Sequence, residues 1–541
     1  MYCQLDYLGD CLPGRIRRAL DELPESLDGT YERSLRELKD TNWEFSRRLF
    51  LCVAVASRPL RVEELAEFLA FDFESGPIPK FREDWRLEEP LEAVLSTCST
   101  LLSLVDVDDS QVIQFSHFSV KEFLTSSRFA QKCDTISRRY HVSMTPAHTV
   151  VAQVCLGILL HLDKNVTRES LTNFPLAEYA AKHWVEHARF EGVSENAEEG
   201  MKQLFDASKP HLAIWIWIHS PYPQWRSQDR GKRPSPPCGT PLHYAALCGL
   251  HTVVKFLAIE HSRDVHSQGG NDESTPLHLA SEKGHVEVVR ILVEHGADTT
   301  VQDNHGSTPL HRASWPSFTN IDLVRFLIMH GADVMAQNKF GSTPLHGASS
   351  SGNVDVARFL VEHGADATAQ DKDGWTPLHH ASFNGSVGLA RFLVEHGADP
   401  IAQDKDGATP LHGASWGRNM DVVRFLVEHG ADVTAQDKHG LTPLHLVPSP
   451  HMGNVDLERF LVEHGADVKV RDWQGWTPLH YASLRGNVDL ARFLVERGAD
   501  VTVQGKDGST PLHKASENDH ADLARFLVER GADATALDKD A

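Results

Sequence analysis

Residues 374–379 read Gly374-Trp375-Thr376-Pro377-Leu378-His379, and the last four residues of this stretch recur along the chain. The copies of Thr-Pro-Leu-His begin at Thr240, Thr275, Thr308, Thr343, Thr376, Thr409, Thr442, Thr477 and Thr510. Successive copies are 33 residues apart, or 35 where two residues are added. A period of this length is typical of stacked-repeat architectures, in which each unit buries apolar surface against its neighbours. The sequence therefore predicts a solenoid over residues 239–541.

Each unit contains the signals of two short helices and an extended loop. Thr376 is a good helix N-cap, and Pro377 suits the first helical position because its missing N–H would be unpaired there anyway. A second apolar helix is expected over 389–395, and Gly397 lies where a helix ends in the left-handed conformation. Residues 402–407 then form an extended finger. Such a unit cannot bury both of its faces alone, so the units must stack.

These units resemble the ankyrin repeat. The motifs Gly-x-Thr-Pro-Leu-His-x-Ala near the start of a unit and Gly-Ala-Asp near its end carry the resemblance. It implies a mainly α solenoid of nine repeats that binds other proteins. The departures are local. Glu273 replaces a finger glycine, residues 315–319 and 447–452 lengthen the turn between the helices, and Asp519 replaces a turn glycine in the last repeat.

Differences between the copies locate a candidate binding face. Variation collects at the finger tip and at the start of the turn between the helices, positions that line the partner-binding concave face of ankyrin arrays. Exposed aromatic side chains lower solubility but suit an interface. The predicted protein-binding residues are Trp315, Phe340, Trp375, Phe383, Trp416, Leu441, Trp473, Trp476 and Leu484. The alternative, that each tryptophan packs on the finger of its neighbour, stays open.

Residues 1–130 contain helical patterns followed by two strand-like runs. Apolar periodicity predicts helices around 20–35, 43–53, 65–69 and 91–95, and strands over 101–105 and 112–115. Three of these helices followed by the hairpin are the elements of a winged-helix domain, of mixed α and β structure.

This region resembles the winged-helix segment that follows the NTPase domain in fungal NACHT–ankyrin proteins of the STAND class. The matching motifs lie at 23–32, at 58–66 and at 117–124, where the chain reads His-Phe-Ser-Val-Lys-Glu-Phe-Leu. In that family the winged helix packs on the nucleotide-binding domain and helps to hold the receptor shut. The resemblance therefore implies an NTPase domain as a partner, in the same chain or in another.

A winged helix also raises a DNA-binding alternative. The expected groove-facing helix, around 91–104, contains Glu92 and no Lys or Arg, and its neighbour carries Glu63, Glu64 and Glu67. Base and phosphate contacts need basic or amide side chains, and the net charge of the chain is -22. The sequence therefore predicts a protein-packing role and no nucleic-acid partner.

Residues 131–220 read as an α-helical connecting region, and residues 221–238 as a linker rich in Pro, Ser and charge. The apolar run at 150–162 is too short to span a bilayer. Trp215 and Trp217 are expected to cover the open first end of the array, with a ligand pocket as the alternative. The basic residues of the linker suit a solvated segment better than a nuclear import signal.

Two sequence features could be mistaken for a catalytic or metal site, and one nucleotide-binding motif is absent. Residues 413–417 match Gly-x-Ser-x-Gly, but they lie in a repeat helix rather than in the strand–turn–helix of hydrolases. The histidines occur about once per unit, and packed units lie about 8–10 Å apart, too far to share one zinc ion. No Gly-x-x-x-x-Gly-Lys-Ser/Thr loop is present. The sequence predicts a non-enzyme without metal or cofactor, in which the histidines hydrogen-bond threonine and backbone.

Eight cysteines without a CxxC pair favour a reduced, cytoplasmic protein, and the first residues lack a signal-peptide pattern. We therefore expect a non-catalytic interaction scaffold, the sensor arm of a NACHT/STAND-type signalling receptor. Two alternatives stay open: the C-terminal half of a signalling NTPase whose gene model is truncated, and a stand-alone ankyrin adaptor. Residues 538–540 resemble the opening of a tenth finger, so both ends are expected to be trimmed.

Overall fold

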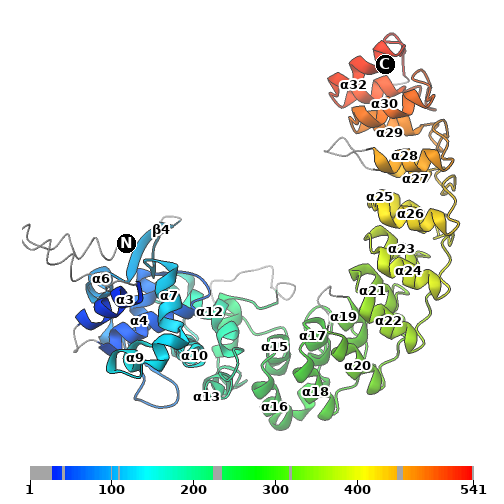
Figure 1. The fold of residues 1–541 in the computed structure, drawn as a ribbon. Helices are drawn as coiled ribbons and strands as arrows, with labels where there is room; N and C mark the ends of the chain where they lie inside the picture. The colour runs from blue at the N-terminus through cyan, green and yellow to red at the C-terminus, as the bar shows by residue number, and fades with distance from the viewer. Residues whose placement is uncertain are drawn as a thin grey trace, which may run out of the picture. The chain divides into compact units, whose positions relative to one another are not determined.

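The computed structural model describes residues 27–38, 43–98, 100–107, 110–222, 234–315, 320–447 and 455–538. The chain divides into two compact units, one formed by residues 1–276 and 294–297 and the other by residues 277–293 and 298–541. Each unit is described by itself (Figure 1). The expected helix at 20–35 and the linker at 221–238 lie partly outside the described residues.

The first unit begins with a winged helix, as the sequence predicted. Its helices and strands are α3 (Leu27–Glu37), α4 (Trp43–Val55), β1 (Leu60–Arg61), α5 (Val62–Phe68), α6 (Pro90–Cys98), β4 (Leu102–Val107) and β5 (Ser110–Phe115). The sheet order is β1-β5-β4, with both pairs antiparallel and Ile113 opposite Leu60 and Leu104. An insert of β2 (Phe71–Asp72), β3 (Lys80–Phe81) and η3 (Glu83–Trp85) separates α5 from α6.

Helices follow the winged helix and build the core of the first unit. They are α7 (Phe118–Thr125), α8 (Ser127–Gln131), α9 (Thr135–Tyr140), α10 (Met144–His161), α11 (Arg168–Leu171), α12 (Leu176–Ala188), α13 (Glu198–Leu204) and α14 (His211–Ile218). The central helix α10 packs against α4, α12 and α13. Within the described residues, the stretch Thr135–His161 is long and apolar enough to cross a membrane, and 56% of its most apolar window is buried. Its place in the core accounts for that apolar character.

Two buried carboxylates lie on α5 of the winged helix, and one of them joins it to a following helix. Glu64 binds Arg58 at 2.6 and 2.8 Å and also Arg61. Glu67 accepts the backbone N–H of Leu176 at 2.7 Å, at the start of α12. Burial raises the pKa of Glu67, whereas for Glu64 the arginine bonds outweigh burial and lower the pKa. These acidic side chains therefore serve intramolecular packing, and they would oppose DNA.

The first repeat lies in the first unit, with α15 (Pro241–Leu247), α16 (His251–Glu260) and η5 (Ser262–His266). It packs against α13, where the Lys202 ammonium lies 4.7 Å from the ring centroid of Phe256. Trp215 does not cover this end, contrary to the sequence expectation. Its indole N–H donates to Ala181 O at 2.8 Å, and its ring packs on Trp184 inside the connecting region.

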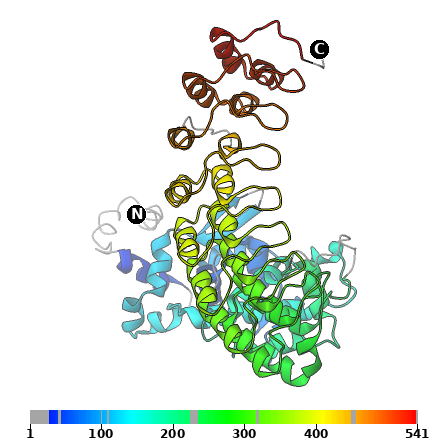
Figure 2. The ribbon, with the colours of Figure 1, turned by 90° about the vertical axis from the view of Figure 1, so that its right-hand side faces the viewer.

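The second unit is a stack of helix pairs, numbered here as repeats two to nine in the order of their Thr-Pro-Leu-His motifs. The first helices are α17 (Pro276–Glu282), α19 (Pro309–Ser314), α21 (Pro344–Ser351), α23 (Pro377–Phe383), α25 (Pro410–Trp416), α27 (Pro443–Leu446), α29 (Pro478–Leu484) and α31 (Pro511–Glu517). The second helices are α18 (Val286–Glu294), α20 (Ile321–Met329), α22 (Val354–Glu362), α24 (Val387–Glu395), α26 (Met420–Glu428), α28 (Asp456–Glu463), α30 (Val488–Glu496) and α32 (Ala521–Glu529). Within this unit the first helices lie on the concave side (Figure 1), and the fingers project along one edge (Figure 2).

The threonine and histidine that recur in each motif join neighbouring repeats. In repeat four, the backbone N–H of Thr343 donates to His346 Nδ1 at 3.1 Å. His346 Nε2 lies 3.1 Å from Trp375 O in the next finger, and it carries the proton because Nδ1 accepts. The equivalent bond to the next finger is made by His243, His278, His311, His379, His412 and His480. The expectation that histidine bonds threonine and backbone is confirmed.

The fingers also pair directly through backbone hydrogen bonds. The N–H of Lys372 donates to Phe340 O at 2.8 Å, and that of Lys405 donates to Asp373 O at 2.9 Å. Within a finger, Asp371 Oδ1 accepts the N–H groups of Asp373 and Trp375 at 2.9 Å. Each finger is thus shaped by its aspartate and fixed to the finger before it.

A ladder of arginines and phenylalanines joins the second helices. The guanidinium of each arginine lies 4.7–5.6 Å from the ring centroid of the phenylalanine in the next repeat. The pairs are Arg290–Phe326, Arg325–Phe359, Arg358–Phe392, Arg391–Phe425, Arg424–Phe460, Arg459–Phe493 and Arg492–Phe526. Such contacts contribute about 0.5–1 kcal/mol each at exposed sites. The convex side is therefore occupied by contacts between repeats.

Candidate protein-binding face of the repeat array

The predicted binding residues fall into two groups by exposure. Five are exposed: Trp315 (60%), Phe340 (59%), Phe383 (39%), Trp416 (51%) and Trp473 (57%). The other four, Trp375, Leu441, Trp476 and Leu484, are half-buried. Contacts made within the array by the half-buried group explain the difference.

Three of the exposed rings share one position, seven residues after the motif threonine. Trp315 follows the last residue of α19, while Phe383 and Trp416 end α23 and α25. In repeat four the same position is Ser350. These side chains form a column on the concave side across repeats three to six, which we call the aromatic column.

Two residues of the column lie against glycines of the next repeat. A Cβ added at Gly347 would lie 3.5 Å from Trp315 Cε3, and one added at Gly413 would lie 3.7 Å from Phe383 Cβ. Both glycines are inside helices, where glycine is about 1 kcal/mol less favourable than alanine. Their lack of a side chain lets the Trp315 ring and the Cβ of Phe383 lie against the next helix, while both residues stay exposed.

Trp375 extends the column towards the finger. Its ring centroid lies 4.9 Å from that of His380 and 6.2 Å from that of Phe383. Trp375 also supplies the carbonyl that binds His346 of the preceding repeat. Its backbone builds the stack, and its half-buried ring widens the aromatic surface of repeat five.

Trp476 occupies the same position in repeat eight but is held more tightly. Its ring stacks on His480 at 6.0 Å and lies edge-to-face with Tyr481 at 5.6 Å. The Lys514 ammonium, one repeat further on, lies 4.8 Å from the ring, and a Cβ on Gly505 would come within 2.7 Å of Trp476 Cδ1. Trp476 therefore packs on the next finger, as the alternative reading described.

The remaining predicted residues lie at or near the finger tips. Phe340 stacks on His305 of the preceding finger with 6.2 Å between centroids, and Trp473 lies 6.1 Å from His439. The carbonyl of half-buried Leu441 accepts from His412 Nε2 at 3.1 Å. Leu484, the last residue of α29, is half-buried at the column position of repeat eight.

Charge is unevenly distributed on this face, which the sequence analysis did not detect. The helices α19, α21, α23 and α25 contain no Asp or Glu, although the whole chain has 75 acidic residues. The finger tips of repeats four to seven carry exposed lysines at one repeated position: Lys339, Lys372, Lys405 and Lys438. Aligning the finger motif position by position would have shown this row.

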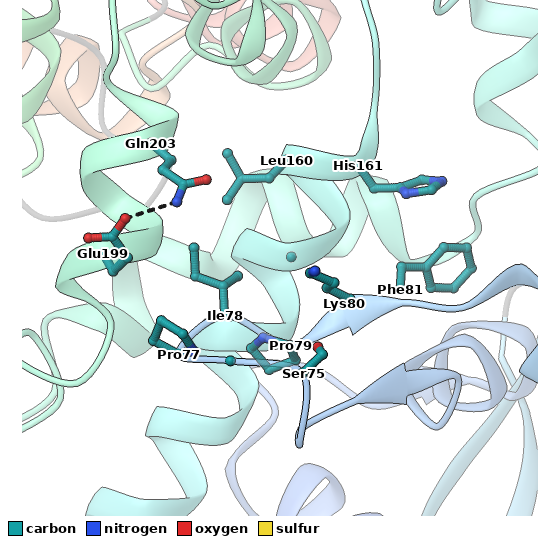
Figure 3. Close-up of a pocket in the computed structure, with 12 residues that line it drawn as sticks. Ser75, Pro77, Ile78, Pro79, Lys80, Phe81, Leu160, His161, Glu199 and Gln203 are labelled. Carbon is teal, nitrogen blue, oxygen red and sulfur yellow. Dashed lines mark hydrogen bonds between the residues drawn. The ribbon is translucent and has the colours of Figure 1, made fainter.

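A cavity of about 660 Å³ lies in the first unit, between the β2–β3 insert and helices α10 and α13. Figure 3 shows Lys80 and His161 on one side of it and Glu199 on the other, with Ile78 and Leu160 between them. The Gln203 amide donates to Glu199 at 2.9 Å, so these two polar groups bind each other. The cavity holds no nucleophile paired with a base. Among the described residues, no group of three His, Cys, Asp or Glu side chains could hold a metal ion.

A chain of hydrogen-bonded polar side chains links α10 and α12 in the first unit. His148 Nδ1 lies 2.9 Å from His187 Nδ1, and His187 Nε2 lies 3.0 Å from the Tyr179 hydroxyl, which accepts the N–H of Ser57 at 3.1 Å. Burial lowers the pKa of His187 to about 4, so this residue is neutral at physiological pH. The chain joins the turn after α4 to α12 and serves the packing of the unit.

Two family models match the chain. The ankyrin-repeat model matches overlapping segments that together cover residues 242–538, and the winged-helix domain of GPI inositol-deacylase matches residues 39–134. Azaphilone pigments biosynthesis cluster protein L of Monascus ruber is 30% identical over 295 residues, which are 52% of this chain and 61% of that protein.

Shorter matches cover only repeat segments. Palmitoyltransferase AKR1 of Lachancea kluyveri is 44% identical over 70 residues, 13% of this chain and 9% of that protein. Transient receptor potential cation channel subfamily A member 1 of Homo sapiens is 37% identical over 81 residues, 15% and 7% of the two chains. The chain thus matches less than two thirds of the length of each of these relatives.

Proposed function

The chain belongs to the ankyrin-repeat family and carries an N-terminal winged-helix domain, and from this we propose that it is a non-catalytic scaffold whose array binds a protein partner. Ankyrin repeats are a non-catalytic, protein-binding architecture. The observation that carries the proposal is the aromatic column, in which Trp315, Phe383 and Trp416 are exposed at equivalent positions. Aromatic side chains in such positions are the usual anchors of protein interfaces.

The proposal extends to the setting of this scaffold. The winged-helix domain and the fungal relative support a role as the sensor arm of a NACHT/STAND-type receptor, in which an NTPase domain is the second partner. We place this function in the cytoplasm, since Cys52, Cys133, Cys155, Cys238 and Cys248 are free thiols, as a reducing compartment would keep them.

Affinity capture with the full chain tests the binding face. The double variant Trp315→Ala/Trp416→Ala removes two exposed rings, and Trp85→Ala removes an exposed tryptophan of the first unit as a matched control. We expect quantitative mass spectrometry to find proteins that the wild type and the control retain and the double variant loses. Loss of one anchor weakens binding about 30-fold when it contributes about 2 kcal/mol.

Thermal unfolding of the three proteins serves as the folding check. The two rings are exposed, so their removal should leave the melting temperature within about 2 °C of the wild type. A captured set that is identical for the wild type and the double variant would contradict the proposed face.

A further inference from the structure

We propose that the concave face of repeats three to six binds an extended, acidic segment of its partner in the polyproline II conformation. In that segment a proline or another flat apolar side chain recurs at every third residue. The inference rests on the proposed function and names the chemistry of the partner. It follows from the spacing, the width and the charge of the aromatic column.

The spacing of the column matches the pitch of a polyproline II helix. Trp315, Ser350, Phe383 and Trp416 stand at the same position of four successive first helices, which pack side by side. Packed helices lie about 8–10 Å apart. A polyproline II helix has three residues per turn and rises about 3.1 Å per residue, so one side returns after about 9 Å. Residues i, i+6 and i+9 of such a segment would meet the three rings, and residue i+3 would meet the serine.

The column is also narrow, which disfavours a helix. Beside it, four residues after each motif threonine, lie Arg312, Gly347, His380 and Gly413. The apolar stripe is therefore one side chain wide except in repeat five, where Trp375 lies beside Phe383. An amphipathic helix buries a stripe at least about 100° wide around its axis. A polyproline II segment needs only one flat contact per turn, which is how such segments bind aromatic-lined grooves. The exposed rings of Trp315, Phe383 and Trp416 offer such contacts.

The charge of this face selects an acidic segment. No carboxylate lies on α19, α21, α23 or α25, and the lysines at the tips of the fingers of repeats four to seven are exposed. Among the described residues, Lys339, Lys372, Lys405 and Lys438 have no carboxylate within 4.0 Å. The same four tips contain five aspartates. Asp371, Asp404 and Asp437 are half-buried and accept backbone N–H groups inside their own fingers. Asp373 and Asp406 are exposed, so the exposed charged side chains of these tips are four lysines and two aspartates. Complementary charge would attract an acidic segment to this face of an otherwise acidic protein.

Selection from a random peptide library displayed on phage, with the folded full chain as the target, tests the inference. We expect enrichment of peptides in which prolines recur at every third residue and Asp or Glu stands between them. Fluorescence anisotropy with one labelled synthetic peptide of this type then measures affinity. Trp416→Ala should weaken it at least tenfold, and Lys372→Gln/Lys405→Gln should weaken it several-fold and reduce its dependence on salt.

Matched controls come from outside the proposed binding face. Trp85→Ala removes an exposed ring of the first unit, and Lys469→Gln removes an exposed lysine outside the finger row, so both should bind as the wild type does. Enrichment of helical peptides with an apolar residue at every seventh position, sensitive to Trp416→Ala, would overturn the inference and leave the proposed function standing. Enrichment of basic peptides would also overturn the inference, because it requires an acidic segment. If no selected peptide depends on Trp416, the inference and the proposed binding face both fail.

Discussion

At the scale of single residues, Gly374 shows why the motif tolerates so little change. Its φ is +83°, and an added Cβ would lie 2.7 Å from Lys405 N and 3.0 Å from the backbone of Asp404. We expect Gly374→Ala to lower the free energy of unfolding by about 1 kcal/mol because alanine disfavours the left-handed conformation. The total loss should be larger, because the next finger must also move to make room for the Cβ. Urea unfolding followed by circular dichroism measures the loss.

Gly397 is the matched control, because its φ is +96° but no atom lies within 4 Å of the added Cβ. Gly397→Ala should therefore lower the free energy of unfolding only by the cost of the left-handed conformation. Equal losses for the two variants would mean that contact between the fingers contributes nothing.

The positions of the candidate binding residues could be predicted from the sequence, but the contacts that surround each residue could not. The variable positions of the motif locate every predicted ring, yet Trp375 and Trp476 share one position and differ in what surrounds them. Trp476 is held by Tyr481 and by Lys514 of the next repeat, whereas beside Trp375 the corresponding residue of the next repeat is Gly413. Whether a ring packs or stays available depends on a residue one repeat away, which no single motif contains. Binding by these residues remains a proposal.

At the scale of elements, repeat seven departs most from its neighbours. Its first helix, α27, has four residues where α25 and α29 have seven, because Val447 precedes Pro448 and is extended, with ψ 114°. Arg485 of repeat eight donates to the carbonyls of His445 and Val447 at 3.3 and 2.8 Å. An arginine thus satisfies carbonyls that a longer helix would have bonded.

The second helix of this repeat contains a buried carboxylate. Glu458 is fully buried where other repeats have Ala357, Ala390 or Ala491, and Arg418 lies 3.6 Å away. Burial raises the pKa of Glu458 despite this arginine, and neither carboxylate oxygen has a hydrogen-bond partner among the described residues. We expect Glu458→Ala to raise the free energy of unfolding by about 1–3 kcal/mol at neutral pH, since an unbonded buried carboxylate is unfavourable.

Chemical denaturation measures this effect, and Glu463→Ala is the control on the same helix. Glu463 is half exposed and pairs only loosely with Arg497 at 3.8 Å, so its loss should change stability by less than about 0.5 kcal/mol. A destabilised Glu458→Ala variant would mean instead that the pair with Arg418 is favourable overall.

Elements with strong local signals could be predicted from the sequence, and those defined by contacts across repeats could not. The repeat helices carry Thr-Pro caps and apolar periodicity, and the winged-helix strands alternate, so both were visible. The β2–β3 insert has strands of two residues, too short for a pattern. The arginine–phenylalanine ladder pairs residues a repeat apart, such as Arg358 and Phe392, and single-unit patterns do not reveal such partners.

At the scale of the whole molecule, the motif histidines make the stability of the array depend on pH. Burial lowers the pKa of His346, His445 and His480 to about 4, and it also lowers the pKa of His311, His379 and His412. In the unfolded chain a histidine takes up a proton near pH 6.5. Below that pH the unfolded state binds more protons than the folded state, so stability falls as the pH drops from about 6.5 towards 4.

The histidines should outweigh the groups of opposite sign. Burial raises the pKa values of Glu67 and Glu458, so these two carboxyls make the folded protein less stable as the pH rises above about 4.5. They are two groups, whereas six motif histidines act in the opposite direction. Each histidine contributes up to about 1.4 kcal/mol per pH unit. We expect the urea midpoint of the array to fall steeply between pH 6.5 and pH 5, measured by far-UV circular dichroism at constant ionic strength.

One variant tests the motif histidines directly. His346→Gln should lower the midpoint at neutral pH and reduce the slope by about one proton. The reduction follows because His346 can no longer take up a proton on unfolding. A midpoint that stays level or rises on acidification would show that the histidines are protonated in the folded array. In that case Nδ1 could not accept from threonine, and the hydrogen bond inside each motif would have to be reassigned, whereas Nε2 could still donate to the next finger.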